Sequence, residues 1–242
     1  MELEYFGKAY HGWQRQPSAI TVQEVLENSL CTLLQEKIQI VGAGRTDAGV
    51  HARQIFAHFD SKNILTTDFI FRINSLLPRD IAVKDLFRVK AEAHARFDAV
   101  SRSYEYWITT RKDVFAIDSA HLVHKDLDLA KMNEAAQILL EYENFKCFSR
   151  SRTDVHTYNC RIDRAEWVQE SDKLVFHITA DRFLRNMVRA VVGTLIEIGL
   201  SKLEVQELHR IIKSQDRSEA GASVPAHGLY LTRILYPESI IF

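Results

Sequence analysis

The chain has 242 residues, a formal net charge of -1 at pH 7 and a hydrophobic fraction of 46%. This size predicts one large α/β domain or two smaller lobes, each with its own apolar core. Since no apolar run approaches the ~20 residues of a membrane helix, and the N-terminus is acidic, we expect a cytoplasmic protein without a membrane segment or secretory signal.

The first half of the chain begins with a well-marked helix. Thr21 and Glu24 form a capping box, and apolar residues recur at helical spacing as far as Leu34. The patterns that follow predict strands over 38–41 and 54–59, a helix over 67–76 ended by Pro78, and strands over 82–88 and 103–109.

The second half repeats this mixture of helices and strands. Asp128 is expected to cap a helix, and two strands are expected over 165–168 and 174–179 around a polar turn. A long helix is predicted over 184–198. Ser201 and Glu204 form a second capping box for a helix that ends at Lys213, and a last strand is predicted over 228–235.

Strands that follow one another directly favour an α+β fold with a largely antiparallel mixed sheet over a doubly wound parallel sheet. The polar connection over 110–118 predicts a boundary between an N-terminal lobe, 1–110, and a C-terminal lobe, 111–242. A groove between two lobes is a natural ligand site, so we expect the active-site cleft there.

Motifs that bind metals or nucleotide cofactors are missing from the sequence. The ten histidines are scattered, and the three cysteines are far apart, which favours reduced thiols over a disulfide framework. We therefore expect no metal ion and no nucleotide cofactor. Two basic segments, 144–164 and 182–189, are compatible with phosphate binding, although a solvated surface of mixed charge is the alternative.

The most informative run covers 42–52, Gly-Ala-Gly-Arg-Thr-Asp-Ala-Gly-Val-His-Ala, between two expected strands. Glycines on both sides of Asp47 allow unusual backbone angles, and the small Ala48 and Gly49 leave room for a bulky substrate. The alternative is an ordinary hairpin loop in which Asp47 bonds its own backbone. Because no second carboxylate is suitably close, a single-carboxylate mechanism is simpler than two-acid hydrolysis.

Two further residues are candidates for the same site. Strand alternation places Tyr104 and Tyr106 on one face, where a tyrosine ring can stack on a nucleobase. Arg185 and Arg189 are one helical turn apart, and an arginine so placed can pair with a carboxylate. The alternatives are a half-buried strand tyrosine and surface arginines.

Several segments, in order along nearly the whole chain, resemble the tRNA pseudouridine synthase A family. The run 44–52 is similar to its signature. The other matching segments are 10–14, 21–23, 77–81, 94–97, 102–104, 186–189 with 192–193, and 228–231. Phe6 departs from the family pattern, in which an aspartate often precedes the glycine, and the first strand is expected to be short.

The resemblance implies the pseudouridine synthase fold and the isomerisation of uridine to pseudouridine in the anticodon stem-loop of tRNA, at tRNA positions 38, 39 and 40. It implies that Asp47 is the essential aspartate, Arg189 its ion-pair partner and Tyr104 the residue that stacks on the target base. It also implies a homodimer that needs no cofactor.

The resemblance places Arg45 near the flipped nucleotide. The remaining candidates for RNA binding are His94, Arg96, Arg150 and Arg152. A base inside a stem must leave the stack, at a cost of a few kcal/mol. Phosphate contacts carry no sequence information, which suits an enzyme acting at several adjacent positions.

Whether Asp47 adds to the sugar or removes the C2′ proton stays open, because both routes use the same carboxylate. Three other functions are also compatible with parts of the sequence. These are a tRNA-binding or chaperone protein without activity, the same isomerisation on a small nuclear or messenger RNA, and an unrelated carboxylate hydrolase.

Overall fold

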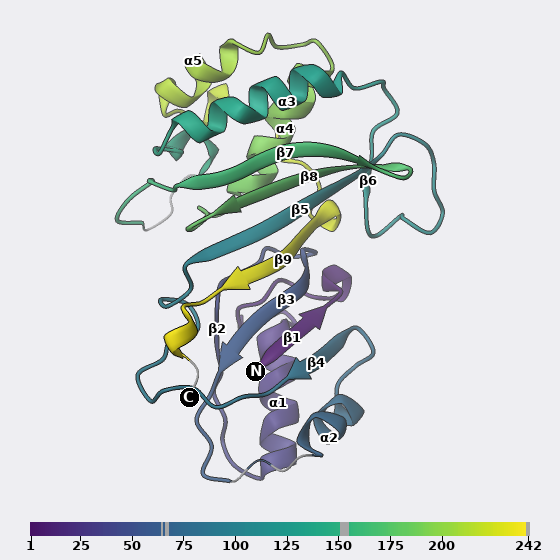
Figure 1. Ribbon diagram of the computed structural model, residues 1–242. Coiled ribbons are helices and arrows are strands. Elements are labelled where there is room, and N and C mark those ends of the chain that lie inside the picture. The colour runs from purple at the N-terminus through teal and green to yellow at the C-terminus, as the bar shows by residue number, and fades with distance from the viewer. Residues whose placement is uncertain (64, 66–67, 151–154, 241–242) are drawn as a thin grey trace. The chain divides into compact units, whose positions relative to one another are not determined.

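The computed structural model describes residues 1–63, 65, 68–150 and 155–240 (Figure 1). The chain divides into two compact units, the first made of Met1–Val100 with Tyr230–Phe242 and the second of Ser101–Leu229. The C-terminal segment belongs to the first unit because its strand returns to pair there. The lobe limits at residues 110 and 111 stay a prediction.

The first unit has a mixed sheet in the order β4-β1-β3-β9, with β2 paired to β3. Its strands are β1 (Glu2–Tyr5), β2 (Val41–Gly42), β3 (His51–His58), β4 (Ile81–Asp85) and β9 (Leu229–Leu235). All pairs among β1 to β4 are antiparallel. Strand β9 runs parallel to β3, with Tyr230 opposite His51.

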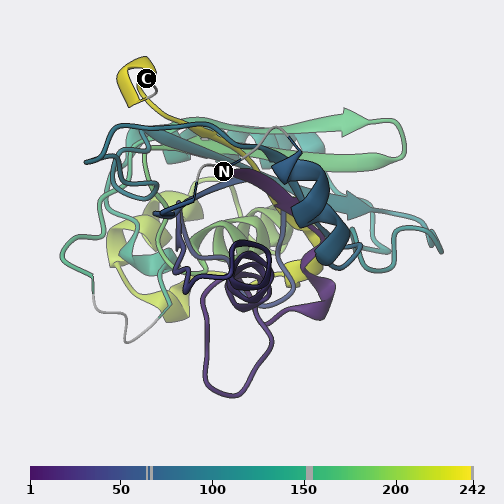
Figure 2. The same cartoon turned by 90° about the horizontal axis from the view of Figure 1, so that it is seen from below.

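Helices α1 (Val22–Leu34) and α2 (Phe69–Leu76) belong to the first unit, and α1 is seen end-on in Figure 2. The predicted cap of α1 is confirmed, because Thr21 Oγ1 accepts a hydrogen bond from Glu24 N at 3.3 Å. Val22, Leu26 and Leu30 are fully buried on one stripe of α1. The predicted start of α2 at 67 lies outside the described residues.

The strand predicted over 38–41 is much shorter than expected, since only Val41 and Gly42 pair with β3. Side chains of α1 occupy the backbone groups that a strand would use: Glu27 Oε1 accepts from Ile40 N at 3.1 Å, and Cys31 Sγ accepts from Ile38 N at 3.2 Å. The backbone is therefore satisfied without a ladder.

The second unit has an antiparallel sheet in the order β5-β8-β7, with β6 parallel to β5. Its strands are β5 (Ser101–Thr109), β6 (His121–Leu122), β7 (Ile162–Glu170) and β8 (Lys173–Ala180), and its helices are α3 (Leu129–Ile138), α4 (Met187–Gly199) and α5 (Glu207–Ser214). Asp128 Oδ1 accepts from Lys131 N at 3.0 Å, which confirms the predicted cap of α3. Both units combine helices with mainly antiparallel strands, so the predicted α+β class is confirmed.

The second predicted capping box is wrong. Ser201 has a φ of +54° and its N–H donates to Ile198 O at 2.9 Å, so it closes the end of α4. Helix α5 begins only at Glu207, whose side chain accepts from Glu204 N at 2.9 Å. The Ser and Glu pattern was present, but the left-handed turn at Ser201 delays the next helix.

Six short 3-10 helices complete the described structure: η1 (Gly7–Ala9), η2 (Leu139–Glu141), η3 (Lys146–Phe148), η4 (Arg217–Glu219), η5 (Ala226–Gly228) and η6 (Glu238–Ile240). Within the described ranges, no helix is both long and apolar enough to cross a membrane.

Candidate active site

Asp47 lies on a tight turn between β2 and β3. Val50 N donates to Asp47 O at 3.2 Å, and Gly49 has a φ of +79°, a conformation that favours glycine. Asp47 itself is half-buried and Ala48 beside it is exposed. The turn thus places half-buried Asp47 beside a small, exposed residue, and access of a substrate to its carboxylate stays a prediction.

The segment before α1 supports this turn through its backbone. Trp13 N donates to Thr46 O at 3.3 Å, and Gly49 N donates to Tyr10 O at 3.2 Å. Gly12 has a φ of +86°, and a Cβ there would lie 2.3 Å from Thr46 O. The Tyr-His-Gly-Trp-Gln motif therefore has a structural role, which is to fix the backbone on both sides of Asp47.

Two tyrosine hydroxyls extend this support. The hydroxyls of Tyr5 and Thr46 are 2.8 Å apart, and Tyr10 Oη donates to Asp80 Oδ1 at 2.6 Å. Burial, together with the hydrogen bond to Asp80, raises the pKa of Tyr10. Strand β1 and the segment before β4 are thus both tied to the Asp47 turn.

His51 is fully buried directly after the turn. Its Nδ1 accepts from Gly7 N at 2.9 Å, so the proton of a neutral ring lies on Nε2. The ring stacks on Phe6, with centroids 4.1 Å apart, and lies 4.7 Å from the Tyr230 ring. Phe6, which departs from the family pattern, therefore covers a face of His51.

Arg189 lies in the first turn of α4 and is half-buried. Its Nε donates to Val224 O at 2.7 Å, while its own carbonyl accepts from Val224 N at 3.1 Å. The side chain and the backbone of Arg189 are thus both hydrogen-bonded to Val224. The prediction that Arg185 lies one helical turn before Arg189 is wrong, because Arg185 precedes the helix and Asn186, with a φ of +68°, breaks the helical path.

Tyr104 lies in β5 and is half-buried. Its ring meets Phe183 edge-on, with centroids 5.1 Å apart and an interplanar angle of 88°. Tyr106, two residues on, is fully buried and donates its hydroxyl to Pro225 O at 2.9 Å. The two tyrosines therefore differ in accessibility, and Tyr104 has the more exposed ring.

The predicted RNA-binding residues fall into different local settings. His94 Nδ1 accepts from Arg96 N at 3.1 Å and from Phe97 N at 3.3 Å, so it caps a turn. That turn exposes Arg96 and leaves the Phe97 side chain 73% exposed, with the guanidinium 5.6 Å from the ring centroid. His94 thus shapes a surface in which Arg96 and Phe97 are the accessible groups.

Arg45 and Arg150 are exposed. Gly44, before Arg45, has no atom within 4 Å of where a Cβ would lie, so this side of the loop is open. Arg150 N donates to Arg185 O at 3.0 Å, which fixes the backbone at one end of the basic segment. Arg152 lies outside the described residues.

Sequence reasoning missed the segment 217–225, which holds Arg189 through Val224. The only available signal was Gly221 and Pro225 close together between a helix and a strand, and that pattern is also typical of a plain loop. In the part of the chain that the structure describes, no three His, Cys, Asp or Glu side chains are grouped to hold a metal ion. The expectation of no cofactor stays a prediction.

Comparison with known proteins gives one consistent family. Residues 3–98 and 135–237 match the family described as tRNA pseudouridine synthase; Asp47 and Arg189 fall inside these ranges, and Tyr104 lies between them. The protein named tRNA pseudouridine synthase A from Parabacteroides distasonis is 49% identical to this chain over 241 residues, and the match covers 98% of this chain and 95% of that protein. The one from Porphyromonas gingivalis is 49% identical over 243 residues, covering 98% and 96%. The one from Bacteroides fragilis is 50% identical over 241 residues, covering 98% and 96%. The chain, with its α+β fold, therefore belongs to the tRNA pseudouridine synthase family of isomerases.

Proposed function

We propose that this protein isomerises uridine to pseudouridine in the anticodon stem-loop of tRNA, at tRNA positions 38, 39 and 40, with Asp47 as its one essential carboxylate. The observation that carries the proposal is the Asp47 turn. Its backbone is held from Tyr10 and Trp13, while the residue after Asp47 is small and exposed. Such a turn can offer a fixed carboxylate to a bulky flipped nucleotide.

The reaction breaks the bond from N1 of uracil to C1′ and forms a bond from C5 to C1′, after which the C5 hydrogen leaves as a proton. Asp47 starts this sequence either by adding to C1′ or by taking the C2′ proton. Both routes need the carboxylate beside the ribose of an unstacked nucleotide. The released base must stay in the site while it turns.

Arg189 is proposed as the partner of Asp47 during this reaction. Its Nε is engaged by the Val224 carbonyl, so the pairing with a carboxylate falls to the Nη groups of the guanidinium. Tyr104 is proposed to stack on the target base, since its ring is the more accessible of the two tyrosines in β5.

Arg45, His94, Arg96, Arg150 and Arg152 are proposed to bind the RNA around the target. His94 acts through the turn that exposes Arg96. The protein is further proposed to act as a cytoplasmic homodimer without a cofactor. Contacts spread over phosphates make binding salt-dependent and largely independent of sequence.

The test is tritium release from tRNA transcripts that carry uridine tritiated at C5 at a single position. Release from substrates labelled at position 38, 39 or 40, and none from a label in the acceptor stem, is the expected result. Messenger and small nuclear RNAs tritiated at uridine C5 are assayed in parallel, and release only from one of these would reject the tRNA substrate. Tight binding of tRNA with no release from any label would reject catalysis.

A further inference from the structure

The segment 220–225 lies directly against α4, backbone to backbone. Gly221 N donates to Thr194 Oγ1 at 2.9 Å. A Cβ on Gly193 would lie 1.8 Å from Ala222 O, so this approach is possible only because position 193 has no side chain. The position of the segment is therefore fixed relative to the helix that carries Arg189.

Within this segment, Val224 sets where the Arg189 guanidinium points. The hydrogen bond from Nε to Val224 O is 2.7 Å long, and the return bond from Val224 N to Arg189 O is 3.1 Å long. A guanidinium is planar, so fixing Nε also fixes the directions of its Nη groups. Any displacement of Val224 would turn the part of Arg189 that is proposed to meet Asp47.

Ser223, the neighbour of Val224, joins three parts of the second unit through one hydroxyl. Its Oγ accepts from Asn186 Nδ2 at 2.6 Å and from Arg217 Nη2 at 2.9 Å. Asn186 is the residue in the left-handed conformation at the start of α4, and its carbonyl accepts from Ala190 N at 3.1 Å. Ser223 thus ties the first turn of α4 to η4.

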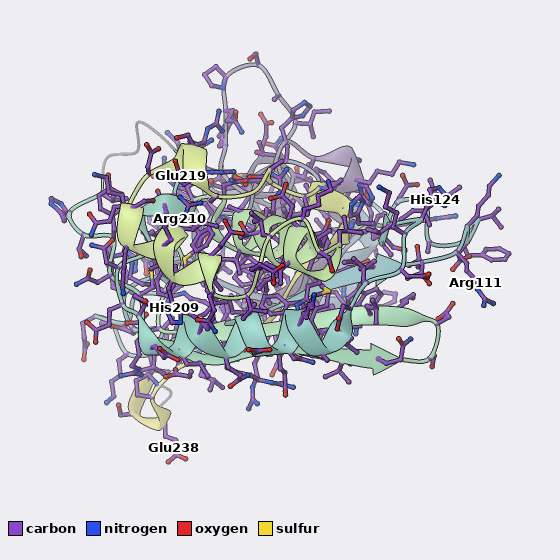
Figure 3. The ribbon with its side chains drawn as sticks, turned by 90° about the horizontal axis from the view of Figure 1, so that it is seen from above. Arg111, His124, His209, Arg210, Glu219 and Glu238 are labelled. Carbon is purple, nitrogen blue, oxygen red and sulfur yellow. The ribbon has the colours of Figure 1, made fainter. Side chains whose placement is uncertain are left out.

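Arg217 completes the connection with a second donor. Its Nη1 donates to Ala220 O at 3.1 Å, so the guanidinium fork holds both ends of the 220–223 stretch. Glu219 of η4 also pairs with Arg210 of α5, and both residues are labelled in Figure 3. Arg210 and Glu219 are exposed, and pairs of this kind contribute little to stability. The inner contacts to Ser223 are half-buried and hold η4 in place.

We infer that Ser223 and Arg217 are positioning residues for the Arg189 guanidinium, acting through Val224 and without contact to the RNA. The inference rests on the proposed function of Arg189. Because small misplacements of a reacting group cost up to ~100-fold in rate, loss of the Ser223 hydroxyl should reduce kcat while leaving tRNA binding unchanged. A residue that bound RNA phosphate would instead change Kd and its salt dependence.

The experiment measures kcat and KM by tritium release, and the Kd for tRNA at several salt concentrations. Ser223→Ala removes the shared acceptor and is expected to lower kcat about 10-fold, with KM, Kd and salt slope unchanged. Ser223→Thr keeps a hydroxyl and should restore most of the rate. Arg217→Lys keeps the charge but loses the fork, and should resemble Ser223→Ala.

Two control variants change neighbouring residues outside this connection. Ser218→Ala removes a hydroxyl that bonds Asp216 in the same 3-10 turn, and Glu219→Gln breaks the exposed pair with Arg210. Both should keep the wild-type kcat. If Ser223→Ala fails to fold, the kcat values of Ser223→Thr and Arg217→Lys still test the inference. The first variant keeps the hydroxyl and should keep most of the rate, whereas the second loses the guanidinium fork and should have a lower kcat.

Wild-type kcat in both Ser223→Ala and Arg217→Lys would overturn the inference while leaving the proposed function intact. A higher Kd with a smaller salt slope in Arg217→Gln, which removes the charge that Arg217→Lys keeps, would also overturn it, since that result indicates a direct phosphate contact. An inactive wild-type protein would reject the proposed function itself, and the inference would fall with it.

Discussion

Gly12 and Thr46 are in backbone contact that no other residue type at position 12 allows. A Cβ there would lie 2.3 Å from the Thr46 carbonyl oxygen, and the φ of +86° disfavours any L side chain. Thr46 immediately precedes Asp47. The contact therefore couples the segment before α1 to the carboxylate proposed to start the reaction.

Gly12→Ala should reduce both stability and activity. The new methyl group must push the Thr46 carbonyl away, and the alanine must adopt a φ that is strained for an L residue. Together these two effects should lower the free energy of unfolding by about 1–3 kcal/mol. Because Asp47 is displaced, the kcat of the variant should fall at least ~10-fold. Urea denaturation and tritium release measure the two effects.

Gly44→Ala is the matched control for stability, because a Cβ at Gly44 meets no atom within 4 Å. Its free energy of unfolding should stay within about 0.5 kcal/mol of the wild type. Equal destabilisation by both substitutions would show that the Gly12 contact has no special role.

Arg189→Lys should lower kcat by ~100-fold or more while leaving the Kd for tRNA nearly unchanged. A lysine ammonium is a point charge without the fork, so it cannot hold the Val224 carbonyl and a carboxylate in the geometry of the guanidinium. Single-turnover rates with saturating enzyme separate this effect from binding. A variant with wild-type kcat would remove Arg189 from the reaction.

Arg96→Ala should weaken tRNA binding and reduce the slope of log K against log salt by about 1. Arg96 is exposed by the turn that His94 caps, and its side chain lies over Phe97. Arg210→Ala is the control with the same charge change, because Arg210 forms a surface pair with Glu219 and lies outside the two basic segments. An equal change of slope in both variants would reject a specific contact at Arg96.

Two half-buried histidines should make the stability of the fold depend on pH. Burial lowers the pKa of His121 from its ordinary 6.5, with nearby His227 adding to the effect, and burial together with His94 lowers that of His58. The unfolded chain then binds more protons just below pH 6.5, so stability should fall as pH drops through this range and level off below the folded pKa values.

Denaturation by urea at pH 7.5 and at lower pH values tests this dependence. His121→Asn removes one titrating group and should make the curve of stability against pH flatter. The charged and titratable groups around His58 include Asp60, His94 and Asp98, so a change at His121 should leave the His58 contribution in place. A wild-type stability that rises on acidification would contradict the prediction.

The elements that the sequence predicted correctly depend on local signals. The caps at Thr21 and Asp128 need only residues within one helical turn, and both are confirmed. The strand over 38–41 failed because its partner groups come from the Glu27 and Cys31 side chains of α1. The capping box at Ser201 failed because a left-handed residue preceded the helix.

The candidate site divides in the same way. The glycines around Asp47 predicted the turn directly, because the conformation of a turn depends on residues that are adjacent in the sequence, such as Gly49. The roles of Gly12 and Tyr10 could not be read from spacing, because their partners lie more than 30 residues away along the chain. The same holds for Val224 and Ser223, which meet the start of α4 only after folding.

The role of Asp47 as the starting carboxylate is tested by tritium release from C5-labelled tRNA, with the wild-type protein, Asp47→Asn and Asp60→Asn assayed in parallel. Asp60 is an exposed carboxylate just after β3, so it controls for the loss of one negative charge. Release by the wild type and Asp60→Asn, with none from an Asp47→Asn variant that still binds tRNA, is the predicted result. Substantial release by Asp47→Asn would contradict a mechanism that begins at this carboxylate.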